Sequence, residues 1–231
     1  MRTTYLSFIL LGCMTLPAQS ALAAHSAAER MAIFAKQPNW TGIWTPVAAN
    51  GSSPEPAFTA SWINKHHNPK TASATDNAAS RCVWGMPRLL NTNHEFEVIV
   101  TPEQTFFSYD INEFRHVWTD GRKHPLHLTD ANTGYSIGHW EGQTLVIDTT
   151  GMESGLWINR KGATLSSKAT LQERWTQTDN DHLKVDATII DPAALARPFV
   201  FTRRFQRDDD NNRLSQQQCF DEDHGGAFHD S

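Results

Sequence analysis

The chain has 231 residues, a formal net charge of −5 and 39% hydrophobic residues. This length is enough for one domain with a sizeable core. The mildly acidic balance, without a basic block, argues against nucleic acid and anionic membrane surfaces as partners.

The first 23 residues resemble a secretory signal. Arg2 precedes an apolar run over residues 5–16, which is too short to cross a bilayer. Ala21 and Ala23 fit an A-x-A cleavage pattern, so we expect cleavage after Ala23 and a periplasmic or secreted protein. The alternative is a lipid anchor on Cys13, which ends the stretch LLGC.

Two cysteines, Cys82 and Cys219, follow the predicted cleavage site. An even pair in an oxidising compartment favours a disulfide, worth roughly 4 kcal/mol for so long a loop. The alternative is two separate buried thiols.

The remaining pattern predicts an all-β domain. A weak helix over 25–36, a strand at 41–47 and a short helix over 57–65 precede a run of short β-rich segments separated by turn residues. The expected strands of this run are 96–101, 105–110, 114–120, 135–141, 143–150, 169–177, 182–190 and 199–206. Their short connections favour antiparallel hairpins in an up-and-down, lipocalin-like β-barrel over residues 24–206, with an acidic tail over 207–231.

Alternation along the strands predicts two charges inside the barrel. Glu173 shares a face with Leu171 and Trp175, and Arg203 lies among phenylalanines of the last strand. Because a lone buried charge is costly, we expect Glu173 and Arg203 to interact. The pair would be either structural or part of a ligand site, since arginine can hold a carboxylate through two hydrogen bonds.

The same rule places aromatic and titratable side chains together. His116, Trp118 and Asp120 share one face, His139 and Glu141 share another, and Tyr109 accompanies Phe107 on a third. Turned inward, these faces would form an aromatic-lined cavity with a few polar groups, which is typical of small-molecule sites. The candidate catalytic residues are His116, Asp120, His139, Glu141 and Tyr109, as histidine–carboxylate acid–base groups.

A second set consists of residues that could contact a ligand. Arg122, His124 and His127 belong to a loop at the rim of the barrel. The full set of candidate ligand-binding residues is Trp118, Arg122, His124, His127, Trp140, Glu173, Trp175 and Arg203.

Cofactor motifs contribute little to the prediction. The chain has no G-x-S-x-G elbow, P-loop, G-x-G-x-x-G after a strand, or H-E-x-x-H. Zinc could be held by His66 and His67, or by His116, His124 and His127, but neither spacing is diagnostic. We therefore expect neither a metal nor a cofactor.

The stretch NWTGIWTP, followed by up-and-down strands, resembles lipocalin-type barrels, which begin with a G-x-W motif. Gly42 and Trp44 are the matching residues. The resemblance implies that an arginine from a late strand, Arg203 or Arg204, covers the tryptophan. The long insertion over 53–95 departs from the usual hairpin.

A second resemblance covers most of the chain after residue 23. TDGRKHP, GYSIGHWEGQTLVIDTTGM, LQERW and IIDP resemble a family of secreted bacterial proteins of unknown function. This chain departs from the family pattern at Gln143, Met152 and His139. The resemblance implies compartment and fold, and no particular activity.

Two classes of function fit these observations. The first is a binding protein whose cavity holds a small aromatic or amphipathic molecule. The second is a cofactor-free lyase, isomerase or cyclase that uses a histidine–carboxylate pair in that cavity. A third possibility is an interaction protein with a filled barrel, and the oligomeric state is left open.

Overall fold

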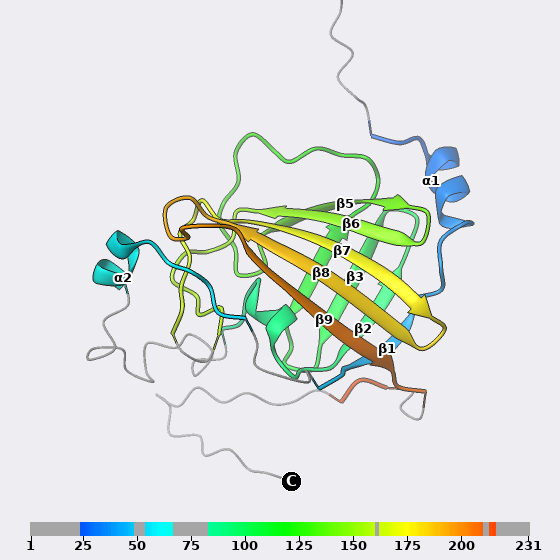
Figure 1. The fold of residues 1–231 in the computed structure, drawn as a ribbon. Coiled ribbons are helices and arrows are strands. Elements are labelled where there is room, and N and C mark those ends of the chain that lie inside the picture. The colour runs from blue at the N-terminus through cyan, green and yellow to red at the C-terminus, as the bar shows by residue number, and fades with distance from the viewer. Residues whose placement is uncertain (1–23, 49–53, 67–82, 160–161, 210–212, 216–231) are drawn as a thin grey trace, which may run out of the picture.

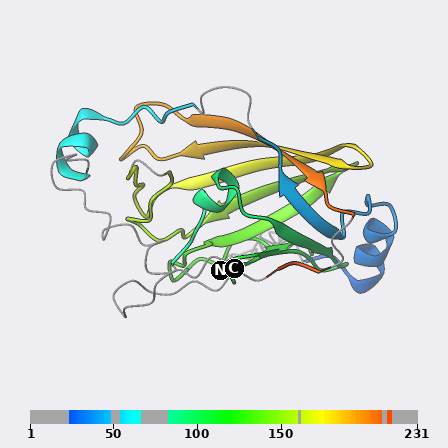
Figure 2. The same ribbon diagram turned by 90° about the horizontal axis from the view of Figure 1, so that it is seen from below.

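The computed structural model describes residues 24–48, 54–66, 83–159, 162–209 and 213–215. They form a closed barrel of nine strands, which confirms the predicted all-β barrel (Figures 1 and 2). The strands are β1 (Gly42–Pro46), β2 (Phe96–Val100), β3 (Gln104–Tyr109), β4 (Phe114–Trp118), β5 (Tyr135–Glu141), β6 (Thr144–Thr150), β7 (Thr170–Asp179), β8 (His182–Ile190) and β9 (Phe199–Arg207). Each predicted strand corresponds to one of them.

One strand pair departs from the predicted antiparallel pattern. Around a ring of nine strands, nine successive reversals of direction cannot close, so at least one pair must be parallel. In this barrel β4 and β5 form that pair, with Val117 opposite Ser136 and Trp118 opposite Ile137. The other eight pairs, including β1 with β9, are antiparallel.

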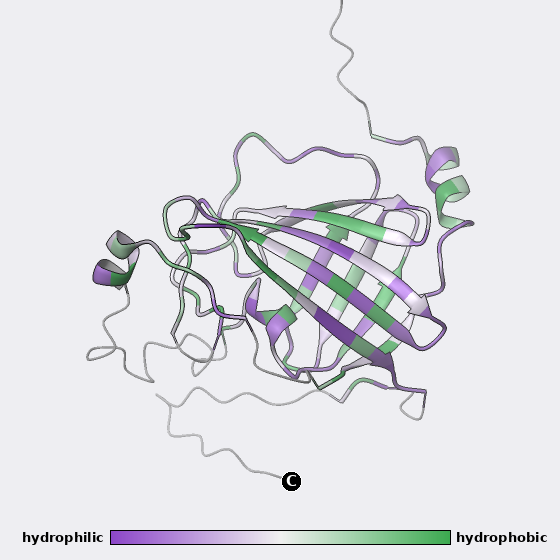
Figure 3. Ribbon diagram, viewed as in Figure 1, coloured by the Kyte–Doolittle hydropathy of each residue, from purple (hydrophilic) through white to green (hydrophobic). Residues whose placement is uncertain are grey.

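Alternating side chains fill the barrel. Hydrophobic and hydrophilic residues alternate along β8 and β9 (Figure 3), and the apolar set of β8 is fully buried, as predicted. Trp175 is the centre of an aromatic cluster. Its ring stacks on Phe205 at 5.4 Å between centroids and lies 5.2 Å from Phe107. The buried rings of Phe96, Phe107, Trp175 and Phe205 are in mutual contact, so this part of the interior is packed.

The described residues also form three short helices. α1 (Ala27–Phe34) begins at a capping box made by Ser26 and Glu29. α2 (Ala60–His66) lies beyond the opposite end of the barrel (Figures 1 and 2). The 3-10 helix η3 (Arg88–Asn91) precedes β2 and buries Leu89 and Leu90.

Trp44 of β1 is covered by an arginine from the last strand. This arginine is Arg207, so neither Arg203 nor Arg204 has the expected role. Its guanidinium carbon lies 4.3 Å from the centroid of the Trp44 ring, and the group donates to the carbonyls of Thr41 (2.8 Å) and Asn39 (2.9 Å). The contact joins the two strands that close the barrel.

Replacing Arg207 with alanine is expected to lower the free energy of unfolding by about 1–2 kcal/mol. The change removes a cation–π contact and leaves two carbonyls without their donor. Urea denaturation followed by tryptophan fluorescence measures the loss. Arg204→Ala is the matched control, because Arg204 is exposed on the same strand. Equal losses in the two variants would contradict this role of Arg207.

Several sequence predictions concern residues outside the described ranges. These are the signal over residues 1–23, the Cys82–Cys219 disulfide, and His67 with its neighbouring loop. Most of the acidic tail also lies outside, although Leu214 is described and is buried.

Candidate functional site

The buried charge at the centre of the barrel is a pair of Glu173 with Arg115. The predicted interaction of Glu173 with Arg203 was therefore wrong. Arg115 donates to both carboxylate oxygens of Glu173, and the exposed fractions of the two residues are both 1%. Because Trp175 Nε1 also donates to Glu173 (3.0 Å), the carboxylate is well satisfied inside the barrel.

Hydroxyl groups complete this network. Arg115 Nε donates to Ser136 Oγ (3.1 Å) and Nη2 to Thr149 Oγ1 (2.8 Å). Burial lowers the pKa of Arg115, but the adjacent carboxylate outweighs that effect and the net direction is upward. Burial also raises the pKa of Tyr109 above its ordinary value, which favours the protonated phenol. The network therefore has the character of a structural core.

The predicted inward face of β4 was wrong. Arg115 and Val117 are buried, whereas His116 is exposed and contacts Gln104 (2.8 Å). Trp118 also faces outward and lies beneath Arg122, 3.8 Å from the guanidinium carbon to the ring centroid. The physical reason is that Arg115 has an internal partner in Glu173, whereas His116 has none.

Asp120 is buried, but its partner is Arg122 rather than a histidine. Arg122 donates to both carboxylate oxygens, from Nε to Oδ1 (2.9 Å) and from Nη2 to Oδ2 (2.7 Å), and these hydrogen bonds lower the pKa of Asp120. A carboxylate held in this way is an acceptor that fixes the rim loop, and it does not form the predicted acid–base pair with His116.

The other predicted histidine–carboxylate pair forms on the outer surface. His139 Nε2 lies 3.1 Å from Glu141, which also accepts from Arg174 (2.8 Å). In the rim loop, His124 lies 3.5 Å from Asp148, and His127 is exposed. These groups face solvent or a loop, so they do not line the barrel interior.

A shallow cavity of about 220 Å³ brings two of the predicted residues together on the outside of the barrel. His116 and Trp118 line it with Tyr135, where β4 meets β5. The rings of His116 and Trp118 stack at 5.9 Å. The two residues therefore share a cavity, but on the opposite side of the barrel wall from the predicted one.

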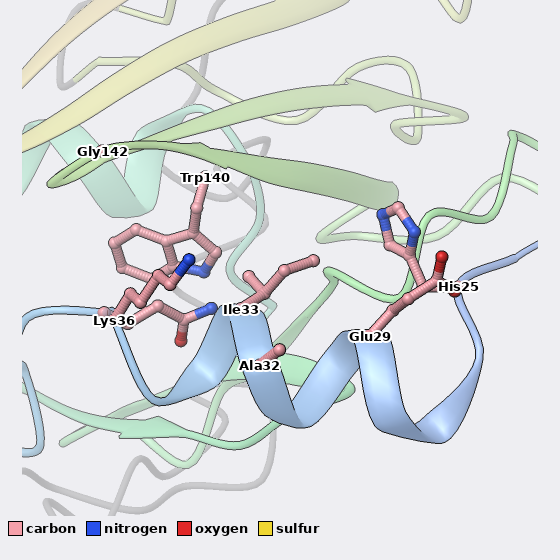
Figure 4. A pocket seen from close by; sticks show the side chains of 8 residues that line it. His25, Glu29, Ala32, Ile33, Lys36, Trp140 and Gly142 are labelled. Carbon is pink, nitrogen blue, oxygen red and sulfur yellow. The ribbon is translucent and has the colours of Figure 1, made fainter.

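A larger cavity, of about 440 Å³, lies between α1 and the β5–β6 hairpin (Figure 4). Its apolar surface comes from Ala32 and Ile33 of α1 and from Trp140, the one predicted ligand-binding residue that lines it. The remaining lining residues are His25, Glu29, Lys36, Gln37 and Gly142. Hydrogen bonds from Ser26 lower the pKa of Glu29, so this end of the cavity carries a negative charge.

Two polar atoms in the wall of this cavity lack partners. Trp140 Nε1 and Gln37 Oε1 are buried, and within the described ranges neither has a hydrogen-bond partner. Helix α1 itself buries no residue, and its start is tied to the barrel by the amide of His25, which donates to the Asp120 carbonyl (2.7 Å). The wall formed by α1 is thus weakly packed.

Sequence reasoning missed a further histidine–carboxylate pair, His94 with Asp110. His94 Nδ1 lies 2.8 Å from Asp110 Oδ1. The hairpin of β2 and β3 pairs Phe96 with Tyr109, so Glu95 lies opposite Asp110 and His94 follows one residue further from the strand. The register of that hairpin is the signal that could have revealed the pair.

Among the described residues, no group of three histidine, cysteine or acidic side chains is arranged to hold a metal ion. No helix in the described part of the chain has the length and apolar character needed to cross a membrane.

Comparisons with known proteins supply no functional assignment. No protein-family model matches the chain, and no curated protein shows significant similarity to it. The function is therefore inferred from the fold and the sites.

Proposed function

We propose that this β-barrel protein binds a small aromatic or amphipathic molecule in the cavity between α1 and the β5–β6 hairpin. The volume of about 440 Å³ falls within the roughly 300–1,000 Å³ typical of small-molecule sites. Apolar walls with charged groups at the edges match a molecule that has an apolar body and a polar end.

The observation that carries the proposal is the environment of Trp140. Its ring packs edge-on against buried Trp40, at 4.8 Å between centroids, so the indole is held in place as one wall of the cavity. Its Nε1 proton has no acceptor among the described residues, and an unsatisfied buried donor costs free energy. A small outward shift of α1 would let an acceptor on a ligand reach this donor.

The proposal includes export from the cytoplasm. It is supported by the signal pattern of residues 1–23 and by the resemblance to secreted bacterial proteins. An oxidising compartment would also suit a disulfide between Cys82 and Cys219.

Titration with 8-anilinonaphthalene-1-sulfonate, an amphipathic aromatic anion, tests the site. We expect saturable binding to one site, measured as enhanced probe fluorescence and quenched tryptophan emission. Trp140→Ala should weaken binding at least about tenfold, because it removes an aromatic wall of the cavity.

Trp118→Ala is the matched control, since Trp118 is a part-buried tryptophan at a different cavity. Circular dichroism and melting temperature confirm that both variants are folded. Binding that survives Trp140→Ala, or that Trp118→Ala weakens equally, would refute the proposed site.

A further inference from the structure

A row of aromatic side chains lies on the outer face of β3 and β4. Phe114 stacks on Phe106, with 5.7 Å between centroids, and Phe106 meets His116 edge-on at 4.8 Å. His116 in turn stacks on Trp118 at 5.9 Å. These four side chains, the aromatic row, form one contiguous surface. Contiguous apolar surface that is rimmed by polar groups is typical of interaction sites.

The aromatic row is accessible from solvent. Phe114 is 48% exposed and His116 is also exposed, whereas Phe106 and Trp118 are half-buried. At the Trp118 end, the row borders the cavity of about 220 Å³ where β4 meets β5. Tyr135 contributes a hydroxyl group to the lining of this cavity. The row therefore leads from an open aromatic surface into a hollow with polar groups.

Two polar atoms beside the rings are arranged to bind a hydroxyl group. His116 Nδ1 lies 2.8 Å from Gln104 Oε1, and because that oxygen can only accept, the ring nitrogen is the donor. In a neutral imidazole the opposite nitrogen, Nε2, is then an acceptor, and the Gln104 amide nitrogen keeps its two donors. Among the described residues, neither His116 Nε2 nor Gln104 Nε2 has a hydrogen-bond partner. A hydroxyl group can use both kinds of atom, because it donates and accepts.

The charge around the row favours a neutral ligand. The guanidinium carbon of Arg122 lies 3.8 Å from the centroid of the Trp118 ring, but both carboxylate oxygens of Asp120 already hold that guanidinium. Nucleic acids bind through unpaired cations, and no member of the row is a lysine or an arginine. An apolar protein surface, including a second copy of this chain, would cover the rings and leave the two polar atoms without partners, which costs free energy.

We propose that the aromatic row and its cavity bind neutral oligosaccharides made of β-linked pyranose units with equatorial hydroxyls. Such a sugar ring carries its hydroxyls around its rim and C–H groups on its two faces. It can therefore stack on an aromatic ring and form hydrogen bonds sideways at the same time. Successive units of an extended chain can reach successive rings, since same-face side chains of a strand recur about every 7 Å.

This site is independent of the function proposed above. The cavity at the end of the row and the cavity beside α1 share no lining residue. The ligands also differ in chemistry, because the α1 cavity is apolar with charged groups at its edges, whereas the row combines aromatic rings with neutral polar atoms.

Isothermal titration calorimetry of the full-length protein with three hexasaccharides tests the site. We expect cellohexaose or chitohexaose, which are β-linked, to bind at least about tenfold more tightly than α-linked maltohexaose, whose chain is bent away from an extended row. Cellohexaose binding alone would assign the site to plain glucans. Preference for chitohexaose would assign it to chains of N-acetylglucosamine.

Variants locate the binding on the row. Trp118→Ala and Phe114→Ala should each weaken binding at least about tenfold, because each removes a stacking surface. Gln104→Leu keeps the size of the side chain but removes the amide, so it should weaken binding by about threefold to tenfold. Val200→Ala is the matched control, because Val200 is an apolar residue, 57% exposed, on the outer face of β9. It should leave the affinity unchanged.

Each outcome decides the inference. Absence of binding, equal affinity for maltohexaose, or equal losses in Trp118→Ala and Val200→Ala would overturn it, with circular dichroism showing that the variants are folded. A dimer in sedimentation that Phe114→Ala dissociates would assign the row to a second copy of the chain and overturn it as well. Because the α1 cavity has its own probe and its own variant, Trp140→Ala, failure of either site leaves the other standing.

Discussion

Replacing Glu173 with leucine is expected to destabilise the protein by about 3–5 kcal/mol, the cost of leaving a buried charge without its partner. Arg115 would keep its guanidinium at 1% exposure, with only the hydroxyls of Ser136 and Thr149 to satisfy it. Trp175 would also lose the acceptor of its indole proton. Urea denaturation of the purified variant measures the change in the free energy of unfolding.

A double variant separates the charge from the packing. Arg115→Met combined with Glu173→Leu removes both charges and should recover most of the lost stability, since apolar residues can replace a buried pair at little cost. The surface pair Arg174–Glu141 is the control, because Glu141→Leu breaks an exposed ion pair and should leave stability nearly unchanged. If the double variant were less stable than Glu173→Leu alone, the role assigned to the ion pair would be wrong.

The second large effect is expected at Trp175, where alanine should cost about 3–5 kcal/mol. The indole is fully buried between Phe205 and Phe107, and a close-packed interior relaxes only partly around the cavity that alanine would leave. Thermal and urea unfolding both measure this loss.

Two further variants calibrate that result. Trp175→Phe should cost less stability than Trp175→Ala, because it keeps most of the aromatic packing. It should still cost something, because it removes the hydrogen bond to Glu173. Trp118→Ala, on the outer face of β4, should cost far less than Trp175→Ala. Comparable losses at the inner and outer tryptophans would contradict the assignment of Trp175 to the core.

The strands were predictable because their side chains alternate cleanly. Leu183, Val185, Ala187 and Ile189 leave no choice of inner face for β8, and short turn-rich connections favour a barrel. Glu173 was also correctly placed inside, because it lies between Leu171 and Trp175.

The candidate site was less predictable, because side-chain partners are set by tertiary contacts. On β4, two aromatic rings and a histidine occupy one face, and an arginine and a valine the other, so composition favours the wrong face. Arg115 is buried because Glu173, 58 residues later, meets it inside the barrel. Likewise, His94 and Asp110 become neighbours through the hairpin register rather than through local spacing.

The parallel contact of β4 with β5 changes how the barrel can be viewed. Starting from β5 and passing through β9 and β1 to β4, the wall is one antiparallel sheet whose two edge strands meet each other. In connectivity this is a circular permutation of a nine-strand meander, in which the first and last strands, β1 and β9, pair in the middle of the sheet. The two edges of the sheet meet where β4 pairs with β5, and this contact is the seam of the barrel. Only two residue pairs join the seam through the backbone, and Arg115 crosses it inside to reach Ser136. The guanidinium that pairs with Glu173 in the core thus also links the two strands whose unpaired edges could otherwise bind other chains.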